Sequence, residues 1–198
     1  MVTVSGIRGI AGQSLTREIV QSFVGSFSTF VIDQNKLHSD QQLKIVIGRD
    51  TRTTGAEFEE LAIKLITSLG IDVLVLGICP TPTVQFMVPQ LNADAGIIIT
   101  SSHNPADWNG LKFVRRDGLF ISASECQVVF QLQKKHASGE KVFTPLVDPL
   151  KHGKIIQHPE AMNLHINAVS TLPYISVEKI SKAKITACVD PINEFLII

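Results

Sequence analysis

The sequence predicts an α/β protein in which a mixed, largely parallel sheet is flanked by helices, followed by an incomplete second α/β domain. Short apolar runs alternate with stretches of helical periodicity through the first 135 residues, as in βαβ units. Glycine and proline then become frequent and no periodicity is sustained. We therefore divide the chain into a domain at residues 1–135, a connector at 136–159 and a partial second domain at 160–198.

The first predicted helix begins at Thr16, whose hydroxyl can cap its amino end. Its apolar residues recur at helical spacing and are Ile19, Val20, Phe23, Phe27, Phe30 and Val31. Residues 43–47 read as a buried strand that Gly48 closes. A second apolar stripe at helical spacing runs through residues 58–69 and stops at Gly70.

Residues 71–76 and 95–100 are predicted to be the next two strands, because both are rich in apolar and β-branched residues. The helix between them opens at Pro82, which suits the first turn of a helix. Residues 111–114 and 119–122 resemble a hairpin around Asp117-Gly118. A helix is expected over residues 124–135.

The tail has weaker signals. The connector holds two glycines and three prolines, which are Gly139, Pro145, Pro149, Gly153 and Pro159. The spacing of Met162, Ile166 and Val169 predicts a short helix, and residues 184–189 predict a strand that ends at Asp190-Pro191. The apolar chain end, residues 195–198, adds exposed surface that could support self-association through the incomplete second domain.

Composition excludes several classes of protein. Eighteen basic residues balance eighteen acidic ones, so bulk binding to nucleic acid or to an anionic membrane is not expected. No apolar run reaches membrane-spanning length and no secretory core precedes Arg8, so we expect a cytoplasmic protein. Cys79, Cys126 and Cys188 are too widely spaced for a zinc knuckle or a disulfide framework, and buried free thiols are expected.

The most informative segment is Thr100-Ser101-Ser102-His103-Asn104-Pro105, which follows a predicted strand. Loops at the carboxyl ends of strands in open α/β sheets are where reactive groups lie. The segment offers two hydroxyls, an imidazole and an amide. A hydrolase triad built on Ser102 and His103 is not expected, because no Gly-x-Ser-x-Gly elbow surrounds them and adjacent extended residues point to opposite sides.

This loop resembles the active-site serine loop of the α-D-phosphohexomutases, and four other segments resemble motifs of that family in the same order. They are Ser5-Gly6-Ile7-Arg8-Gly9, Gly48-Arg49-Asp50-Thr51-Arg52, Pro80-Thr81-Pro82 and Asn109-Gly110-Leu111-Lys112-Phe113. Together the five segments cover roughly residues 3–125, and their combination is specific although each alone is weak.

The resemblance implies an isomerase that moves a phosphoryl group between the 1 and 6 positions of a hexose or hexosamine phosphate. Ser102 would carry the phosphoryl group, a hexose bisphosphate would be the intermediate and activator, and Mg²⁺ would bind the phosphate on Ser102 together with three aspartates. The family's metal, sugar and distal phosphate motifs do not occur in this sequence. We therefore expect weak or no Mg²⁺ binding and no mutase activity from this chain alone. The short Ser-Gly-Ile-Arg-Gly start favours a phosphoglucosamine or phosphomannose substrate.

Each candidate residue has more than one interpretation. Ser101 competes with Ser102 as the phosphorylated hydroxyl, and spacing alone does not separate them. His103 either exchanges protons with phosphate or substrate oxygens or only orients the loop. Arg8, between two glycines, is either a bidentate phosphate ligand or a solvated surface residue. Lys112 is either a proton shuttle or phosphate contact, or a solvated strand residue.

The loop that follows residues 43–47 has a similar ambiguity. Arg49 and Arg52 are candidate phosphate ligands between a strand and a helix, as is Asn104 in the serine loop. For Asp50 we favour an ion pair with an arginine that braces the loop. A second class of function also fits: a non-catalytic phosphate-binding or interaction module derived from the same domain.

Overall fold

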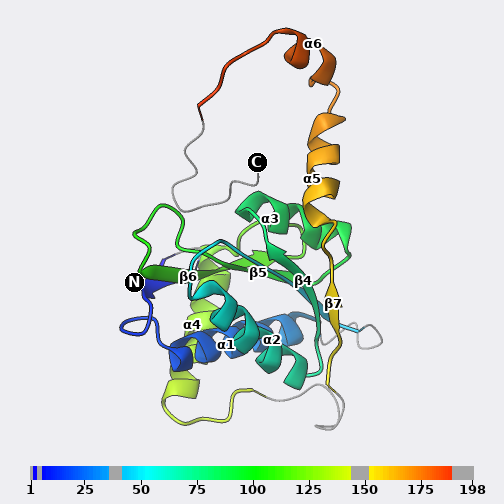
Figure 1. The fold of residues 1–198 in the computed structure, drawn as a ribbon. Coiled ribbons are helices and arrows are strands. Elements are labelled where there is room, and N and C mark those ends of the chain that lie inside the picture. Colours follow the sequence, from blue (N-terminus) through cyan, green and yellow to red (C-terminus); the bar gives the residue numbers. More distant parts are fainter. Residues whose placement is uncertain (1, 4–5, 36–41, 144–151, 189–198) are drawn as a thin grey trace.

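The computed structural model describes residues 2–3, 6–35, 42–143 and 152–188. These residues form a seven-stranded sheet in the order β1-β2-β6-β5-β3-β4-β7 (Figure 1). The strands are β1 (Val2–Thr3), β2 (Gly6–Ile10), β3 (Lys44–Arg49), β4 (Asp72–Ile78), β5 (Ala95–Ile99), β6 (Trp108–Arg115) and β7 (Ile155–Gln157).

Most strands of the sheet run in the same direction. β3 is parallel to β4 and β5, and β4 is parallel to β7. β6 is antiparallel to both β5 and β2, so β2 runs the same way as β5, whereas β1 is antiparallel to β2. Five strands (β2, β3, β4, β5 and β7) therefore share one direction and β1 and β6 oppose it, which confirms the predicted mixed, largely parallel sheet.

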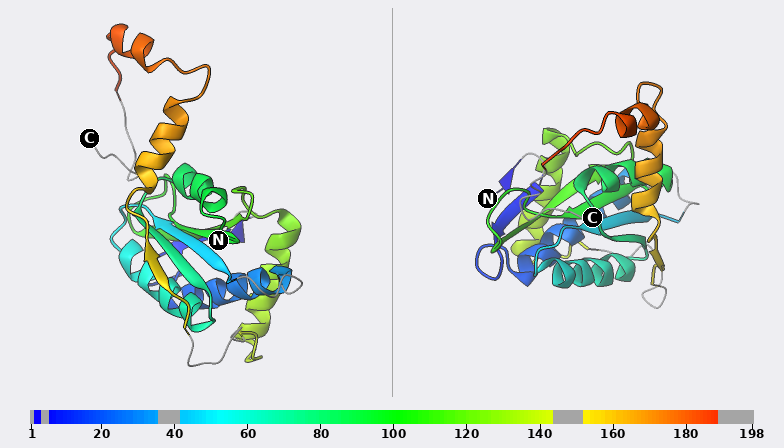
Figure 2. Two further views of the ribbon diagram at one scale, coloured as in Figure 1. Left: turned by 90° about the vertical axis from the view of Figure 1, so that its right-hand side faces the viewer. Right: turned by 45° about the horizontal axis from the view of Figure 1, so that its top comes forward.

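Helices cover both faces of the sheet. The helices are α1 (Arg17–Asn35), α2 (Gly55–Ser68), α3 (Thr81–Gln90), α4 (Ala123–Ala137), α5 (Ala161–Ser170) and α6 (Val177–Lys182). α1, α2 and α4 lie on one face, α3 lies on the other, and α5 extends away beyond α3 (Figures 1 and 2). Of the described helices, none is both long enough and apolar enough to cross a bilayer.

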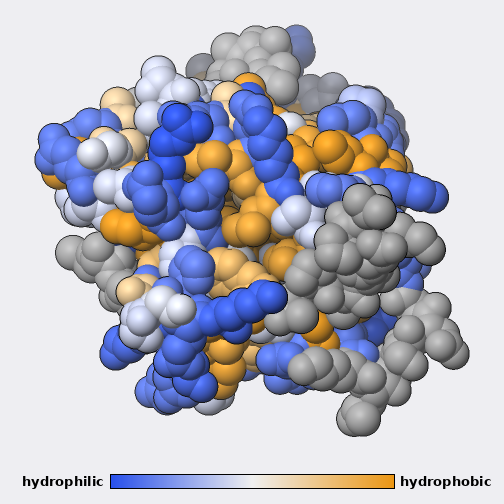
Figure 3. Space-filling view, turned by 90° about the horizontal axis from the view of Figure 1, so that it is seen from below, coloured by the Kyte–Doolittle hydropathy of each residue, from blue (hydrophilic) through white to orange (hydrophobic). Residues whose placement is uncertain are grey.

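The strands are apolar on both sides because both faces are covered. Ile97 and Ile99 pack into the core beneath α1, α2 and α4, whereas Ile98 packs into the core beneath α3. Phe27 of α1 stacks on Phe113 of β6 with ring centroids 4.4 Å apart. On the outside of the three-helix layer, hydrophilic residues surround a central area where apolar residues show through (Figure 3).

Most predicted elements of the first domain are present. Thr16 precedes α1, and its hydroxyl accepts a hydrogen bond from the Ile19 N–H at 3.4 Å. α4 begins with a reciprocal capping box in which Ser122 and Glu125 each accept from the other's backbone N–H. Strong periodicity and these caps agree, which explains why the α-helical part of the domain could be predicted from sequence.

Several strand predictions in this domain were incomplete. β1, which has only two residues, was not predicted. β2 was not predicted, because its five residues include two glycines and carry little strand signal. The second arm of the predicted hairpin, residues 119–122, forms only one isolated bridge, between Val114 and Phe120. It cannot continue as a strand because Ser122 already caps α4.

The tail differs more from its prediction. β7 lies within the predicted connector and extends the first sheet at its edge, beside β4. α5 confirms the predicted short helix, whereas α6 was not predicted. Residues 184–188 form no strand, so that prediction was wrong for them, while Val189, the Asp190-Pro191 end and residues 195–198 lie outside the described residues. A lone strand has no ladder partner and gains little from being extended.

The burial of the cysteines also differs between the first domain and the tail. Cys79 and Cys126 are buried free thiols, as predicted. Cys188 is exposed, so the prediction of a buried thiol was wrong there. The reason is that residues 184–188 pack against no sheet in the described chain.

Candidate functional site

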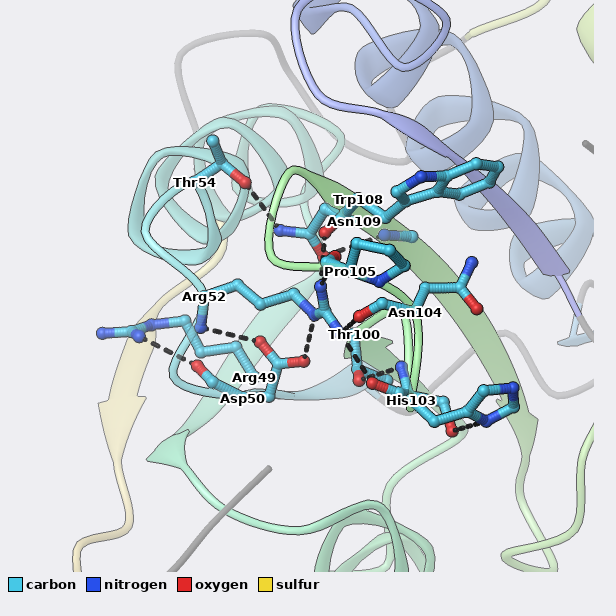
Figure 4. A network of polar contacts seen from close by, with 12 residues as sticks. Arg49, Asp50, Arg52, Thr54, Thr100, His103, Asn104, Pro105, Trp108 and Asn109 are labelled. Atoms are coloured by element: carbon cyan, nitrogen blue, oxygen red, sulfur yellow. Dashed lines mark hydrogen bonds and ion pairs between the residues drawn. The ribbon is translucent and has the colours of Figure 1, made fainter. Parts of the chain in front are cut away.

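The serine loop and the arginine loop lie side by side. β3 and β5 are parallel neighbours, so their carboxyl ends open at the same edge of the sheet. The loop at residues 50–54 follows β3 and leads into α2, and the loop at residues 100–107 joins β5 to β6. Figure 4 shows the Arg52 side chain extending from the first loop to the second.

Arg52 connects the two loops. Its Nη2 donates to the carbonyl oxygens of Ser102 at 2.6 Å and Asn104 at 2.8 Å. Its Nη1 donates to those of Pro105 at 2.6 Å and Trp108 at 2.8 Å. Its Nε donates to Asp50 Oδ2 at 3.0 Å, and the side chain is only 1% exposed.

All five N–H groups of the Arg52 guanidinium are therefore engaged. This leaves no donor for a phosphate. In this structure Arg52 binds the serine loop and Asp50, and it does not make the phosphate contact that we predicted. Asp50 has the bracing role that we favoured, because Oδ1 also accepts from the Arg52 backbone N–H at 3.0 Å. The buried guanidinium has its counter-charge in Asp50.

The two candidate hydroxyls have different environments. Ser101 is 0% exposed, and its Oγ is buried without a hydrogen-bond partner among the described residues. Ser102 is half-exposed, and its Oγ lies 3.4 Å from His103 Nδ1 on the open side of the loop. The geometry thus favours Ser102 as the hydroxyl that a ligand can reach.

Ser102 also has an unusual backbone. Its φ is 56°, in the left-handed region that residues other than glycine rarely adopt. The surrounding contacts hold it there: its N–H donates to Thr100 Oγ1 at 2.9 Å, and its carbonyl accepts from Arg52. Residues kept in sparsely populated conformations cluster at functional sites, where neighbouring structure over-determines them.

His103 and Asn104 complete the outer face of the loop. The His103 side chain is exposed and points away from Arg52 (Figure 4). The Asn104 side chain is half-exposed and also points away from Arg52, while the Asn104 backbone carbonyl binds it (Figure 4). Both side chains therefore remain accessible from the side where Ser102 Oγ lies.

β2 brings Arg8 to the same edge. Arg8 pairs with Gly110 of β6, whose carbonyl accepts from the Thr100 N–H at 3.0 Å. A Cβ on Gly110 would lie 3.1 Å from Arg8 Cγ and 2.8 Å from the Thr100 carbonyl oxygen. Only glycine lets the Arg8 side chain lie this close to the start of the serine loop.

Arg49 and Lys112 both have side-chain contacts outside the serine loop. Arg49 Nε pairs with Glu59 Oε2 of α2 at 3.0 Å, and Nη1 donates to the Asp50 carbonyl at 3.2 Å. Lys112 lies opposite Ile98 in the sheet, on the face away from Leu111 and Phe113 as predicted. Its ammonium is 5.7 Å from the centroid of the Phe120 ring.

Sequence reasoning missed two supporting residues, Thr54 and the buried Asn109. Asn109 donates from Nδ2 to Thr54 Oγ1 at 2.9 Å and accepts at Oδ1 from the Gly110 N–H at 2.8 Å. This links the start of α2 to β6. The predicted strand began only at residue 111, although residues 108–115 form one strand. A buried amide that binds both neighbours has no distinctive spacing in the sequence.

Cys79 is adjacent to this edge but is not a nucleophile. Its N–H donates to the Arg49 carbonyl at 3.0 Å. Burial, and secondarily the charge of Glu59, raise the pKa of its thiol to about 12. The thiol stays protonated at neutral pH and therefore unreactive.

The residues near the serine loop do not by themselves form a magnesium site. The described residues contain no group of three histidine, cysteine, aspartate or glutamate side chains that could hold a metal ion. Both oxygens of Asp50, in the adjacent loop, are occupied by Arg52. A phosphate on Ser102 would supply one hard ligand, which is less than Mg²⁺ requires.

A cavity of ≈ 190 Å³ lies elsewhere in the domain. It is lined by residues that include Phe30 of α1, Ala95 at the amino end of β5 and Arg115 at the carboxyl end of β6. These ends of β5 and β6 are opposite to the serine loop, which joins the other two. The cavity is therefore separate from the candidate site.

Comparison with known proteins identifies relatives for most of the chain. Phosphoglucosamine mutase of Leuconostoc mesenteroides is 34% identical over 170 residues, which cover 85% of this chain and 36% of that protein. Phosphoglucosamine mutase of Leuconostoc citreum is 43% identical over 117 residues, covering 59% and 25%. Phosphoglucosamine/phosphogalactosamine mutase of Sulfurisphaera tokodaii is 29% identical over 192 residues, covering 95% and 38%. The chain thus corresponds to well under half of each relative.

Solved structures share the fold. A phosphoglucomutase/phosphomannomutase family protein of Burkholderia thailandensis superposes with a TM-score of 0.67 at 23% identity, covering 87% of this chain and 37% of that one. Parafusin, a phosphoglucomutase from Paramecium, gives a TM-score of 0.62 at 20% identity, covering 84% and 34%.

The family model for phosphoglucomutase/phosphomannomutase α/β/α domain I matches residues 2–139. That range contains β1 to β6, α1 to α4 and both loops of the candidate site. The chain therefore belongs to the α-D-phosphohexomutase family, of which it carries domain I.

Proposed function

We propose that this chain is the phosphoryl-carrying part of a phosphohexomutase that interconverts the 1- and 6-phosphates of a hexose or hexosamine. The observation that carries the proposal is the position of Ser102: its hydroxyl lies on the open side of a strained loop, whereas the Ser101 hydroxyl is buried. The relatives named phosphoglucosamine mutase support a hexosamine phosphate as the substrate.

In this mechanism the Ser102 Oγ forms a bond to phosphorus while the bond from phosphorus to the sugar oxygen breaks. The phosphoserine is regenerated in this step, in which Ser102 Oγ takes the phosphoryl group from one end of a hexose bisphosphate. The bisphosphate forms in the preceding step, when the phosphoserine passes its phosphoryl group to the other end of the sugar: a bond from phosphorus to the sugar oxygen forms and the bond from phosphorus to Oγ breaks. The distance of 3.4 Å from His103 Nδ1 to Oγ supports a role for His103 in taking and returning the hydroxyl proton. Arg8 and Lys112 supply positive charge to the transferring group, because phosphoryl transfer depends mainly on positioning and electrostatic stabilisation.

We propose a role for Mg²⁺ only in a longer protein that also supplies the carboxylate ligands. When bound it would neutralise charge on the phosphoryl group. Because the described residues lack the carboxylates for such a site, we expect this chain to bind Mg²⁺ weakly or not at all, and to have no mutase turnover by itself. A cytoplasmic location is proposed with the function.

The experiment is a chimera in which residues 2–139 replace the matching domain of the Leuconostoc citreum enzyme. After incubation with a hexose 1,6-bisphosphate, phosphopeptide mapping should find phosphate on Ser102. Ser102→Ala should lower turnover by at least roughly a thousandfold, since loss of a nucleophile removes the covalent route. The matched control, Ser101→Ala, should keep about the parent rate, and phosphate on Ser101 alone would refute the assignment.

The same chimera distinguishes the mutase from the second candidate function, a non-catalytic module. A folded chimera that binds phosphate but shows neither phosphoserine nor turnover would favour a non-catalytic phosphate-binding module. The buried Arg52–Asp50 brace fits that class equally well, because it shapes the loop without taking part in chemistry.

We also propose self-association through the tail. Exposed apolar residues, Leu164, Ile166 and Val169, lie on α5, which follows the edge strand β7 in the chain. The α5 helix has no Asp, Glu, Lys or Arg that would oppose a second copy. Sedimentation should show a concentration-dependent dimer, and Ile166→Lys should abolish it; a monomer at all concentrations would contradict the proposal.

A further inference from the structure

The contacts of Arg52 determine the path of the serine loop and also the direction in which its peptide groups point. The carbonyl oxygens of Ser102, Asn104 and Pro105 all point inward, toward one guanidinium. Each of these oxygens belongs to a planar trans peptide, in which the C=O and the following N–H point in opposite directions. The N–H groups that follow Ser102 and Pro105 therefore point away from Arg52, to the outside of the loop.

These outward groups are the backbone N–H of His103 and Ala106. Neither donates a hydrogen bond to another atom of the described chain, and both residues are exposed. The peptide after Asn104 offers no donor, because the next residue is Pro105. The loop therefore presents these two N–H groups without a hydrogen-bond partner in the described chain, and one of them belongs to His103, whose Nδ1 lies 3.4 Å from the Ser102 hydroxyl.

We propose that Arg52 is a positioning residue: by drawing the loop carbonyls inward, it holds Ser102 in its left-handed conformation and presents the His103 and Ala106 N–H groups to the phosphoryl group. This inference rests on the proposed function of Ser102. Preorganised backbone N–H groups stabilise phosphoryl oxygens without the cost of reorienting water. Arg52 contributes through the loop and does not touch the phosphate.

The geometry requires arginine. A guanidinium has five donors in a planar fork, whereas an ammonium has three and cannot reach five acceptors at once. Arg52→Lys keeps the charge beside Asp50 and loses the fork. Asp50→Asn makes the complementary change. It removes the negative charge beside Arg52 and leaves the four hydrogen bonds from Arg52 to carbonyl oxygens in place.

The test is an NMR titration of the ¹⁵N-labelled 198-residue chain with inorganic phosphate. In the parent chain, phosphate should shift the His103 and Ala106 amide signals saturably. In Arg52→Lys, the amide signals of the sheet should persist, because the fold is kept. The three-bond HN–Hα coupling constant of Ser102, which reports its φ, should leave the range of the left-handed conformation. The affinity of the chain for phosphate should fall about tenfold or more. Asp50→Asn should keep the phosphate response of both amides.

The matched control is Arg115→Lys, the same change at the far end of β6, where Arg115 binds Asp117. It should leave the phosphate response unchanged. The inference is overturned if phosphate does not shift the two amides in the parent chain, if Arg52→Lys binds phosphate as the parent does, or if Asp50→Asn loses as much affinity as Arg52→Lys. The proposed function is judged separately, by phosphate on Ser102 of the chimera, so either can fail without the other.

Discussion

The first 139 residues and the segment from β7 onward use similar amino acids with opposite results. In β5 every residue is buried, and the arginine beneath the neighbouring serine loop is 1% exposed. In α5 only Ala161 is buried, and no residue of α6 is. Ile166 is 53% exposed and Ile185 72%, although isoleucine fills the core of the sheet.

The difference shows that apolar character alone does not make a core. The isoleucines of β5 have strands on both sides and helices above and below. The tail is attached to that body by β7 on β4 and by a few contacts of α5 with α3. His165 stacks on Phe86 and lies 2.9 Å from the buried Thr83 hydroxyl, which makes these residues the second point of attachment.

The largest effect should come from core aromatics. Phe113→Ala removes a buried ring that stacks on Phe27 and should lower the free energy of unfolding by about 3–5 kcal/mol. Ile166→Ala in α5 should change it by less than about 0.5 kcal/mol, because that side chain is mostly exposed. Urea unfolding measures both values, and equal losses would contradict the comparison.

The next effect should come from the joint between the two regions. A Cβ at Gly153 would lie 1.9 Å from the Ile71 carbonyl oxygen, so the backbone must move. Gly153→Ala should destabilise by about 1–3 kcal/mol, as overpacking does, and increase amide exchange in β7. Exchange in β5 should be unchanged, and faster exchange there would contradict this prediction.

A smaller effect should come from the polar contact of α5 with α3. Thr83→Val keeps the shape of a buried side chain and removes the hydroxyl that contacts His165. The expected loss is about 1 kcal/mol, seen as faster amide exchange across α5. If α5 exchange stays at the parent rate, the stacking of His165 on Phe86 is sufficient to hold the helix.

The thiols should report the same comparison without altering stability. Cys188 in the tail is exposed, whereas Cys79 is buried with its pKa raised to about 12. Burial also raises the pKa of Cys126. At pH 8 a thiol reagent should modify Cys188 first and the two buried thiols only on unfolding, as mass spectrometry of timed samples would show. Early modification of Cys79 would contradict the described packing.

Much of the domain could be predicted because local and long-range requirements agree there. Helical periodicity, Thr16 and the apolar strands all indicate the same elements that the fold contains. β2 and β7 could not be predicted, since one is rich in glycine and the other has three residues. Such strands form because a neighbouring strand offers hydrogen bonds, and their own residues do not show which strand that will be.

The sequence by itself determined the family motifs, their order, and that a serine loop follows a buried strand. The tertiary structure decided which serine is accessible and what each arginine of the motif does. Arg49 and Arg52 are both three residues or fewer from the same strand end, yet one pairs with Glu59 of α2 and the other lies beneath the serine loop. The physical reason is that hydrogen-bond partners fifty residues away, such as the Ser102 carbonyl, meet Arg52 only when β3 and β5 pair.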